Sequence, residues 1–396
     1  MNLKLLIFGP GAPDRQTSGL GKAAKHLTDE LAKHVDLTLI EPKQVETLAT
    51  KKVDHETLSF SDFSILKELA TVSIESQLSA YHYQEVTSAN TMEKVESQRL
   101  YKQLTTFSEE LVLAGKKTDF EVIYAHDWIT FKAALELKQK FGKPLLLHVH
   151  SLDFDRNFGQ STSWIFDLEK KAMMEADAVI AVSQYSKKIM STEYGIPEEK
   201  IHVVYHGHTH AKHLVSKSPF TEKIVLFVGR LSGQKGPMQF LDIAEKVHEK
   251  YPNTRFVMSG DGDLYKKLIE AGAASHIADR FHITGYLGHD DLQKLYGLAD
   301  VYCMPSFSEP FGLTALEAAD AGLPLVLSDK CGAAELLPEA ALADPGNVIQ
   351  FAEEIVAILQ DPKKSKARTE AHKEIIKNLT WKRSASKILS VIESII

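Results

Sequence analysis

The stretch VYCMPSFSEPFGLTALEAADAGLPLVLS, residues 301–328, decides the fold. It begins with a short apolar run at 301–305 and ends with a second one at 324–328. Residues 313–321 between them have the apolar spacing of an amphipathic helix. Short apolar runs are typical of parallel strands that are buried on both faces. The stretch therefore predicts a strand, a crossover helix and a second, parallel strand.

The same kind of unit recurs along the chain. Further apolar runs occur at 3–8, 35–40, 120–126, 144–150, 178–183, 201–206, 224–229, 255–260, 281–285 and 341–344. Stretches with helical spacing, such as 21–34 and 237–251, separate many of them. This alternation predicts an α/β protein with two doubly wound, Rossmann-like domains. We expect ligands in the cleft between the domains, beyond the carboxyl ends of the strands.

The domain boundaries follow from breaks in this alternation. A chain of 396 residues is long enough for two domains of similar size. The polar segment 206–223 predicts a boundary between domains at 1–206 and 207–380. Residues 51–118 predict a helical insertion of two or more helices, with a disordered excursion as the alternative. Residues 381–396 predict an amphipathic helix that packs back on the first domain.

Composition restricts the class of protein. The net charge of −7, without a block of Lys and Arg, argues against a nucleic-acid partner. Cys303 and Cys331 are the only cysteines, too few for a zinc site or a disulfide framework. No run approaches a membrane span, and the N-terminus resembles a strand more than a signal peptide. We therefore expect a cytoplasmic protein without integral membrane contact.

The loop that precedes the 313–321 helix has the residues of an anion site. Pro310 and Gly312 allow a tight turn into the helix, whose first N–H groups, at 312–314, favour a diphosphate. Glu309 and Glu317 flank this position and would repel phosphate, so we expect them to bind another part of the ligand. Carboxylates accept hydrogen bonds from paired hydroxyls, and Glu309 could hold a hexose and Glu317 a ribose. An ordinary surface loop is the alternative.

A second loop, at 228–237, contains two cations. Arg230 can bind two phosphate oxygens at once, and Lys235 adds a point charge. Together they could neutralise a departing nucleoside diphosphate without a metal ion. A solvated loop is the alternative.

The first strand is followed by a glycine-rich loop, GPGAPDRQTSGLG at 9–21. It lacks the G-x-G-x-x-G fingerprint of dinucleotide-binding domains, because Asp14 stands at the third required position. It also lacks the G-K-[ST] of a P-loop. We expect a flexible loop whose Gly19 and Gly21 approach a ligand of the opposite domain.

Histidines follow two strands of the first domain. His126 and Asp127 end one run, and His150 ends another, so all three are expected to face the cleft. A metal site is a possible interpretation, but no H-E-x-x-H spacing supports it. The D-x-D pairs at 153–155 and 261–263 could hold a cation, although the second is more typical of a strand-to-helix turn with a cap.

These motifs, in this order, resemble those of the retaining GT-B glycosyltransferases of family 4. The resemblance covers nearly the whole chain and rests on ADAVIAVSQYSKKIM, FVGRLSGQKGP, MSGDGDL, FHITGYL, ADVYCMPS and EPFGLTALEAADAGLPLV. The elements HDW and HVHSLDFDR are most similar to the glycogen and starch synthase branch. The resemblance implies an acceptor-side domain at 1–206 and a nucleotide-sugar donor domain at 207–380.

The resemblance also implies a role for each candidate residue. Glu309 and Glu317 would contact the sugar and the ribose of the donor, while Arg230 and Lys235 bind its diphosphate. The catalytic set would be His150, Glu309, Arg230 and Lys235, with His126 and Asp127 as weaker candidates. The remaining donor contacts would come from Gly19, Leu20, Gly21, Tyr286, Leu287, Phe311, Gly312, Leu313 and Thr314. No metal or other cofactor is implied, and the donor's own phosphate would assist deprotonation of the acceptor.

Two positions depart from the family pattern. Synthases often have a lysine before the glycine loop, where this chain has Gln16 and Thr17. The usual Gly-Gly before a later glutamate is replaced by CGAAE at 331–335, which leaves Glu335 a structural or acceptor-side role.

The leading prediction is a hexosyltransferase that moves glucose from UDP-glucose or ADP-glucose to a glucan or another carbohydrate. A surface polysaccharide, a lipid precursor or a sugar phosphate is an alternative acceptor. An NAD-dependent dehydrogenase would share the wound sheets but needs the missing fingerprint. A sugar-binding protein without catalytic activity is the third alternative.

Overall fold

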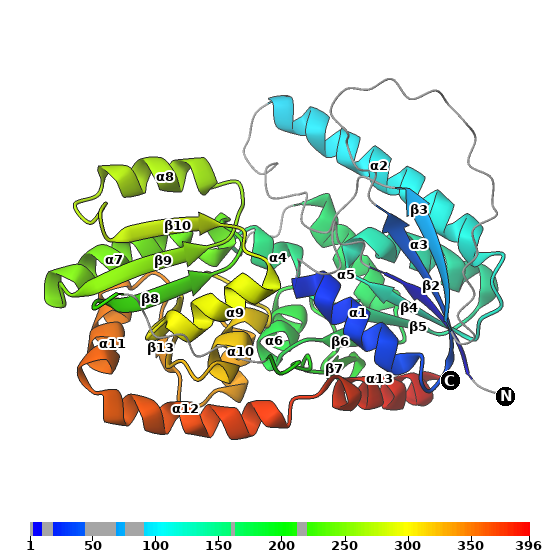
Figure 1. Ribbon diagram of the computed structural model, residues 1–396. Helices are drawn as coiled ribbons and strands as arrows, with labels where there is room; N and C mark the ends of the chain where they lie inside the picture. The colour runs from blue at the N-terminus through cyan, green and yellow to red at the C-terminus, as the bar shows by residue number, and fades with distance from the viewer. Residues whose placement is uncertain (1–2, 10–18, 44–68, 76–90, 160–162, 212–219) are drawn as a thin grey trace.

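The computed structural model describes residues 3–9, 19–43, 69–75, 91–159, 163–211 and 220–396. Within these ranges the chain forms two parallel β-sheets, each flanked by helices (Figure 1). The prediction of two doubly wound α/β domains is confirmed. No helix of the described ranges is long and apolar enough to cross a membrane.

The first sheet has seven strands in the order β3-β2-β1-β4-β5-β6-β7. The order reverses direction at β1, so β1 and β4 leave a crevice at their carboxyl ends. The strands are β1 (Lys4–Phe8), β2 (Asp36–Lys43), β3 (Leu69–Glu75), β4 (Val122–His126), β5 (Leu145–Val149), β6 (Ala178–Ala181) and β7 (Ile201–Val203). The helices are α1 (Gly19–Leu31), α2 (Thr91–Gly115), α3 (Trp128–Phe141), α4 (Asp153–Arg156), α5 (Trp164–Glu175) and α6 (Gln184–Thr192), with the 3₁₀ turn η1 (Glu198–Lys200).

The second sheet has six strands in the order β10-β9-β8-β11-β12-β13. They are β8 (Lys223–Val228), β9 (Thr254–Ser259), β10 (Phe281–Gly285), β11 (Val301–Met304), β12 (Leu325–Ser328) and β13 (Ala341–Ala343). The helices are α7 (Pro237–Lys250), α8 (Tyr265–Ala274), α9 (His289–Leu298), α10 (Leu313–Asp320), α11 (Val348–Gln360), α12 (Pro362–Lys377) and α13 (Trp381–Ile395), with the 3₁₀ turns η2 (Gly233–Lys235) and η3 (Gly332–Leu336).

Alternation along each strand explains why both sheets are covered on two faces. In β8, Ile224 and Leu226 belong to one apolar cluster, whereas Val225 and Phe227 belong to the cluster on the opposite face. Successive side chains of a strand point to opposite faces, so a continuous apolar run needs helices on both sides. The apolar runs of the sequence are therefore buried strands.

Residues 51–118 differ from the helical insertion that the sequence predicts. The described part contains one strand, β3, and one long helix, α2. β3 pairs in parallel with β2, with Leu69 opposite Leu37, and adds the seventh strand at the edge. Its sequence LATVSIE alternates small or polar residues with apolar ones, a weaker pattern than the runs of the central strands. Residues 51–68 and 76–90 lie outside the described residues.

The chain crosses between the two domains twice, and both crossings lie together. The first follows β7 and the second joins α12 to α13. His208 N donates to Leu379 O at 2.7 Å, and Trp381 Nε1 donates to Thr209 Oγ1 at 3.0 Å. α13 then packs on α1 of the first domain (Figure 1). The Trp381 ring stacks on the His26 ring, with 5.0 Å between the centroids.

Gly207 is the point of closest approach between the crossings. A Cβ atom at this position would lie 2.2 Å from Trp381 N, and backbone cannot move aside as a flexible side chain can. Glycine is therefore required by the proximity of two backbones.

Gly207→Ala is expected to lower the free energy of unfolding by about 1–3 kcal/mol, because the added methyl group overlaps the backbone of Trp381. Urea unfolding, followed by circular dichroism, measures this change. Gly288→Ala is the matched control, since a Cβ there meets nothing within 4 Å. Equal midpoints for the two variants would contradict the close approach.

Candidate functional site

The loop between β11 and α10, which contains Glu309, is held by both domains. Ser308 Oγ donates to Asp155 Oδ1 at 2.5 Å, and Ser183 Oγ donates to Pro310 O at 2.7 Å. From its own domain, Glu309 N donates to Lys330 O at 2.9 Å. The first domain therefore fixes the position of the loop.

Glu309 and Lys235, predicted from separate motifs, form an ion pair. Lys235 Nζ donates to Glu309 Oε2 at 2.5 Å, and the Glu309 side chain is buried. Lys235 ends η2, and Gly236 follows with φ of 68°. A Cβ at Gly236 would lie 2.3 Å from Pro305 O, so this turn packs directly on the end of β11. The two loops meet because parallel strands present their carboxyl ends at one edge.

Gly312 allows the chain to turn from this loop into α10. Its φ is 105°, and a Cβ would lie 3.0 Å from Cys331 Sγ. The preceding residue, Phe311, is buried, and its ring lies edge-on to the His206 ring of the first domain, with 4.9 Å between the centroids. Ala315 N donates to Gly312 O, and the first N–H groups of a helix have no partner within it. The start of α10 therefore has the donors that an anion needs.

Further along α10, two tyrosines that the sequence analysis did not select support the candidate residues. Tyr302 donates to Thr314 Oγ1 at 2.8 Å, and Tyr296 donates to Glu317 Oε2 at 3.1 Å. Leu313, the first residue of the helix, is half-buried. The tyrosine hydroxyl groups hold the side chains of Thr314 and Glu317 in place.

Lys22 of the first domain also reaches this helix. Its Nζ lies 3.2 Å from Glu317 Oε1 in an ion pair between the domains. Lys22 follows the predicted Gly19, Leu20 and Gly21 directly, and its position next to that motif was the signal that could have found it. Residues 19–21 form the first turn of α1, with the Leu20 side chain buried, whereas the rest of the loop, 10–18, lies outside the described residues.

Arg230, Tyr286 and Leu287 follow the carboxyl ends of β8 and β10. Arg230 and Leu287 are half-buried, and Tyr286 is 55% exposed. The D-x-D turn at 261–263 supports the same edge. A Cβ at Gly260 would lie 1.8 Å from Gly229 O, and Leu231 N donates to Asp261 O at 2.9 Å. The turn therefore serves packing, and the structure assigns it no cation.

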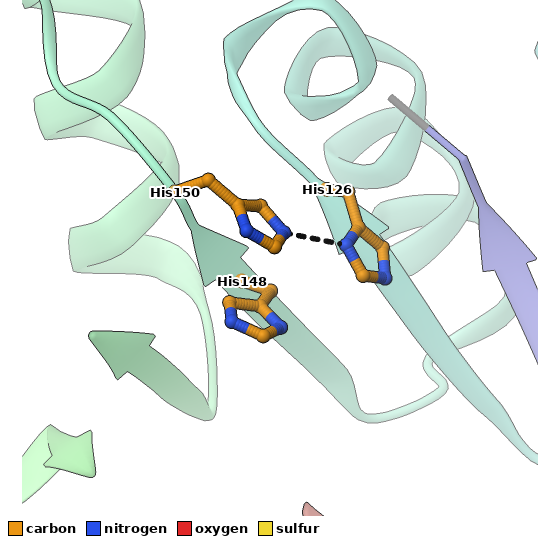
Figure 2. Close-up of side chains that lie close together, drawn as sticks. All are labelled: His126, His148 and His150. Atoms are coloured by element: carbon orange, nitrogen blue, oxygen red, sulfur yellow. Dashed lines mark hydrogen bonds between the residues drawn. The ribbon is translucent and has the colours of Figure 1, made fainter. Parts of the chain in front are cut away.

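Four buried histidines of the first domain form a stack: His126, His148, His150 and His206. Figure 2 shows the first three. His126 Nδ1 and His150 Nε2 share a hydrogen bond of 2.9 Å, and His150 Nδ1 lies 3.4 Å from His206 Nε2. The His148 ring stacks on His150 with 4.1 Å between centroids. His150, expected to face the cleft, is only 7% exposed, and both its ring nitrogens contact other histidines.

Burial keeps the stack neutral. It lowers the pKa of His126 and of His206 to about 3, and it lowers the pKa of His148 and His150 well below the ordinary value. In a neutral imidazole one nitrogen donates and the other accepts. If His150 donates to His126 it must accept from His206, so the tautomers of the three are coupled.

Asp127 fixes the backbone of the stack. Its Oδ1 accepts a hydrogen bond from His150 N at 2.7 Å, and its own φ is 57°, a conformation that few residues other than glycine adopt. Burial raises the pKa of its carboxyl group to about 7. Asp127 therefore positions the β5 end.

Two other acidic candidates, Glu335 and Asp153, form hydrogen bonds that stabilise the fold. Glu335 accepts from Gln184 N at 3.0 Å and Tyr185 N at 2.6 Å, at the start of α6, and thereby joins the domains. Asp153 accepts from Ser163 Oγ at 2.5 Å within the buried network of Arg156. These contacts give both carboxylates a structural role.

Comparison with protein families places two domains on the chain. A model of Glycosyltransferase Family 4 matches residues 17–212, and a model described as Glycosyl transferases group 1 matches residues 210–375. The two matches meet in the linker that follows β7.

Individual relatives agree with these matches. An uncharacterized glycosyltransferase of Methanocaldococcus jannaschii is 31% identical over 234 residues, which are 55% of this chain and 60% of the relative. Glycogen synthase of Mycobacterium tuberculosis is 27% identical over 281 residues, 68% of each chain. The structure of sucrose-phosphate synthase from Thermosynechococcus elongatus superposes with a TM-score of 0.76 at 21% identity, covering 99% of this chain and 98% of that one. That similarity shows the GT-B fold.

The neutral histidine stack predicts a specific pH dependence. The pKa of His126 is about 3 in the folded chain and about 6.5 when unfolded, so its contribution to stability is complete above pH 6.5 and declines as the pH falls towards 3. Between pH 7.5 and 5.5 the wild type should lose about 1.4 kcal/mol more stability than His126→Gln, which has no titrating group there.

Urea unfolding of both proteins at the two pH values measures this difference. The subtraction removes the contributions of carboxyl groups such as Asp127, whose raised pKa acts in the opposite direction. Equal losses in the two proteins would show that His126 is not buried in its neutral form.

Proposed function

This chain belongs to the family 4 and group 1 glycosyltransferases, and from that premise we propose that it transfers glucose from a nucleoside diphosphate sugar to a carbohydrate acceptor with retention of configuration. The observation that supports this most is the pair of carboxylates around the start of α10. Glu309 contacts Lys235 at the end of η2, and Glu317 contacts Lys22 of α1 in the other domain. Each carboxylate is therefore paired with a lysine, and the phosphate groups of a donor could bind the same lysine.

In this proposal the two carboxylates bind hydroxyl groups. Glu309, in the loop before α10, would accept from the hexose, and Glu317, one turn into the helix, would accept from the ribose. A carboxylate can accept two hydroxyl donors at once, which suits neighbouring hydroxyls of a sugar ring. Both are held in place by protein contacts before a ligand arrives, which lowers the entropic cost of binding.

The diphosphate would lie between them. Lys235, now 2.5 Å from Glu309, and Arg230 would stabilise the charge that develops on the leaving group, together with the N–H groups of Gly312, Leu313 and Thr314. Donor binding then exchanges the Lys235–Glu309 pair for Lys235–phosphate and Glu309–hydroxyl contacts. The positive groups suffice for this arrangement, so the proposal requires no metal ion.

The rest of the donor would contact both domains. Tyr286 and Leu287 at the end of β10 would line the pocket of the base, and the first turn of α1, Gly19 to Gly21, would approach the phosphates. Lys22 follows this turn directly, and its side chain could exchange its ion pair with Glu317 for one with the phosphates of the donor.

The histidine stack would lie next to the reacting sugar. A stack that is neutral at pH 7 places no fixed positive charge beside the cleavage site. Retention then requires that the acceptor attacks on the face from which the diphosphate departs, where a phosphate oxygen takes its proton.

Relatives of the chain suggest two acceptor classes first. The similarity to a glycogen synthase favours a glucan. A sugar phosphate is the alternative, by analogy with the sucrose-phosphate synthase that has the same fold. A surface polysaccharide or a lipid precursor is a further possibility within the same reaction.

The purified chain should be incubated with UDP-glucose, ADP-glucose or GDP-glucose, each with glycogen or a mixture of sugar phosphates. We expect release of one nucleoside diphosphate that depends on an acceptor, with an α-linked product by NMR. An inverted product would exclude retention. Absence of both nucleotide release and sugar incorporation in every combination would refute the proposed function.

Glu309→Gln and Lys235→Ala are each expected to lower kcat by about 10²–10³-fold, because each removes a preorganised charge that the transition state uses. Initial rates with the donor identified above measure this effect. Lys250→Ala is a matched control, since Lys250 forms an exposed pair with Glu353 in the same domain. If Glu309→Gln and Lys235→Ala retain the rates of the control, the site has been placed wrongly.

A further inference from the structure

A second group of potential metal ligands lies away from the histidine stack. It consists of His208 and His210, in the linker that follows β7, and Asp320, the last residue of α10. We call it the linker triad. One donor atom of each residue lies within 4.8 Å of the donor atoms of the other two. Nothing in the proposed transfer reaction uses these side chains.

The local chain explains why the two histidines face the same carboxylate. Residues 204–211 are neither helix, strand nor turn, and His208 and His210 lie two positions apart in this segment. His208 Nε2 is 3.0 Å from Asp320 Oδ2, and His210 Nδ1 is 2.7 Å from Asp320 Oδ1. Each carboxylate oxygen therefore faces one imidazole.

Burial makes this arrangement more than a surface ion pair. The side chains of His208 and Asp320 are 6% and 9% exposed, whereas His210 is half exposed. Among the residues that the structure describes, the buried His208 Nε2 has no hydrogen-bond partner with acceptable angles, although the carboxylate lies 3.0 Å away. His208 Nε2 is thus close to the carboxylate of Asp320 without forming a hydrogen bond to it. This arrangement suits two ligand atoms that bind the same metal ion.

The position of Asp320 favours a cation as well. It is the last residue of α10, and the C-terminal end of a helix has partial negative charge. A divalent ion between Asp320 and the two imidazoles would interact favourably with this end of the helix and would use the lone pair of each nitrogen.

The geometry of the rings distinguishes the linker triad from the histidine stack. The lone pair of an imidazole nitrogen lies in the plane of its ring. His208 and His210 are nearly perpendicular, at 84°, with centroids 5.4 Å apart, so their lone pairs can converge. In the histidine stack, the planes of the His148 and His150 rings differ by only 16°, so their lone pairs point side by side and do not converge. The facing nitrogens of His126 and His150 already form a hydrogen bond with each other (Figure 2).

We propose that His208, His210 and Asp320 bind a divalent transition-metal ion, with Zn²⁺ as the best match. Two imidazole nitrogens and one carboxylate oxygen are a ligand set that Zn²⁺ accepts with tetrahedral geometry, and the half-exposed His210 leaves room for solvent at the fourth position. The ion would attach the interdomain linker to the end of α10. Its role is structural, and it is separate from the metal-free transfer reaction.

The untagged full chain, first treated with a chelator, should be titrated with Co²⁺ while its visible absorption is recorded, and then with Zn²⁺. We expect one equivalent of Co²⁺ to give the strong d–d bands of a tetrahedral site, and Zn²⁺ to displace it. His210→Ala and Asp320→Asn should each weaken binding at least about tenfold, since even outer-shell changes cost 10–100-fold. Zn²⁺ should also raise the Tm of the wild type and leave that of His210→Ala unchanged.

Two control variants locate the ion. His276→Ala removes an exposed histidine that pairs with Glu245, and it should bind metal as the wild type does. His148→Gln alters the histidine stack and should also retain binding. Absence of Co²⁺ binding to the wild type, or binding that His210→Ala retains and His148→Gln loses, would overturn the assignment. Because metal binding is read directly, this result is independent of whether the chain transfers a sugar.

Discussion

The contact on which the candidate site depends is the one that holds the Glu309 loop between the domains. Ser183 and Asp155 of the first domain bind the residues on either side of Glu309. Gly332 makes this possible, because a Cβ there would lie 2.2 Å from Pro310 O and 2.6 Å from Ser183 Cβ. The carboxylate that faces Lys235 thus belongs to the second domain but is placed by the first.

Burial of polar groups is the second constraint. The histidine stack, Asp127 and the Arg156–Glu169 pair are all buried, and each takes part in at least one hydrogen bond or ion pair within the described residues. A buried polar group without a partner is costly, so such networks specify one arrangement of the surrounding loops. Burial raises the pKa of Glu169 to about 8, in spite of the opposing effect of Arg156.

Local sequence patterns were sufficient for much of the fold and part of the site. Continuous apolar runs identified the central strands, and the Pro310–Gly312 turn identified the helix start, because both depend on neighbours in sequence. Lys22, Tyr296 and His206 were not selected, since their contacts with Glu317, Phe311 and His150 join residues far apart in the chain. The edge strand β3 was missed because its alternation is half polar. The roles assigned to the donor-site residues remain predictions.

The passage of both domain connections past Gly207 and Trp381 has a mechanical consequence. Two connections at one point form a pivot for any rotation of the domains, and such a rotation also has to break the contacts of Ser183, Asp155 and Glu335 between them. Phe311 contacts His206 beside this pivot, whereas α8 and β10 lie on the opposite side of the molecule from α12 and α13 (Figure 1). A given rotation therefore displaces the end of β10 through a longer arc than the start of α10. During such a rotation the contacts at the start of α10 would change little, and α8 and β10 would move furthest.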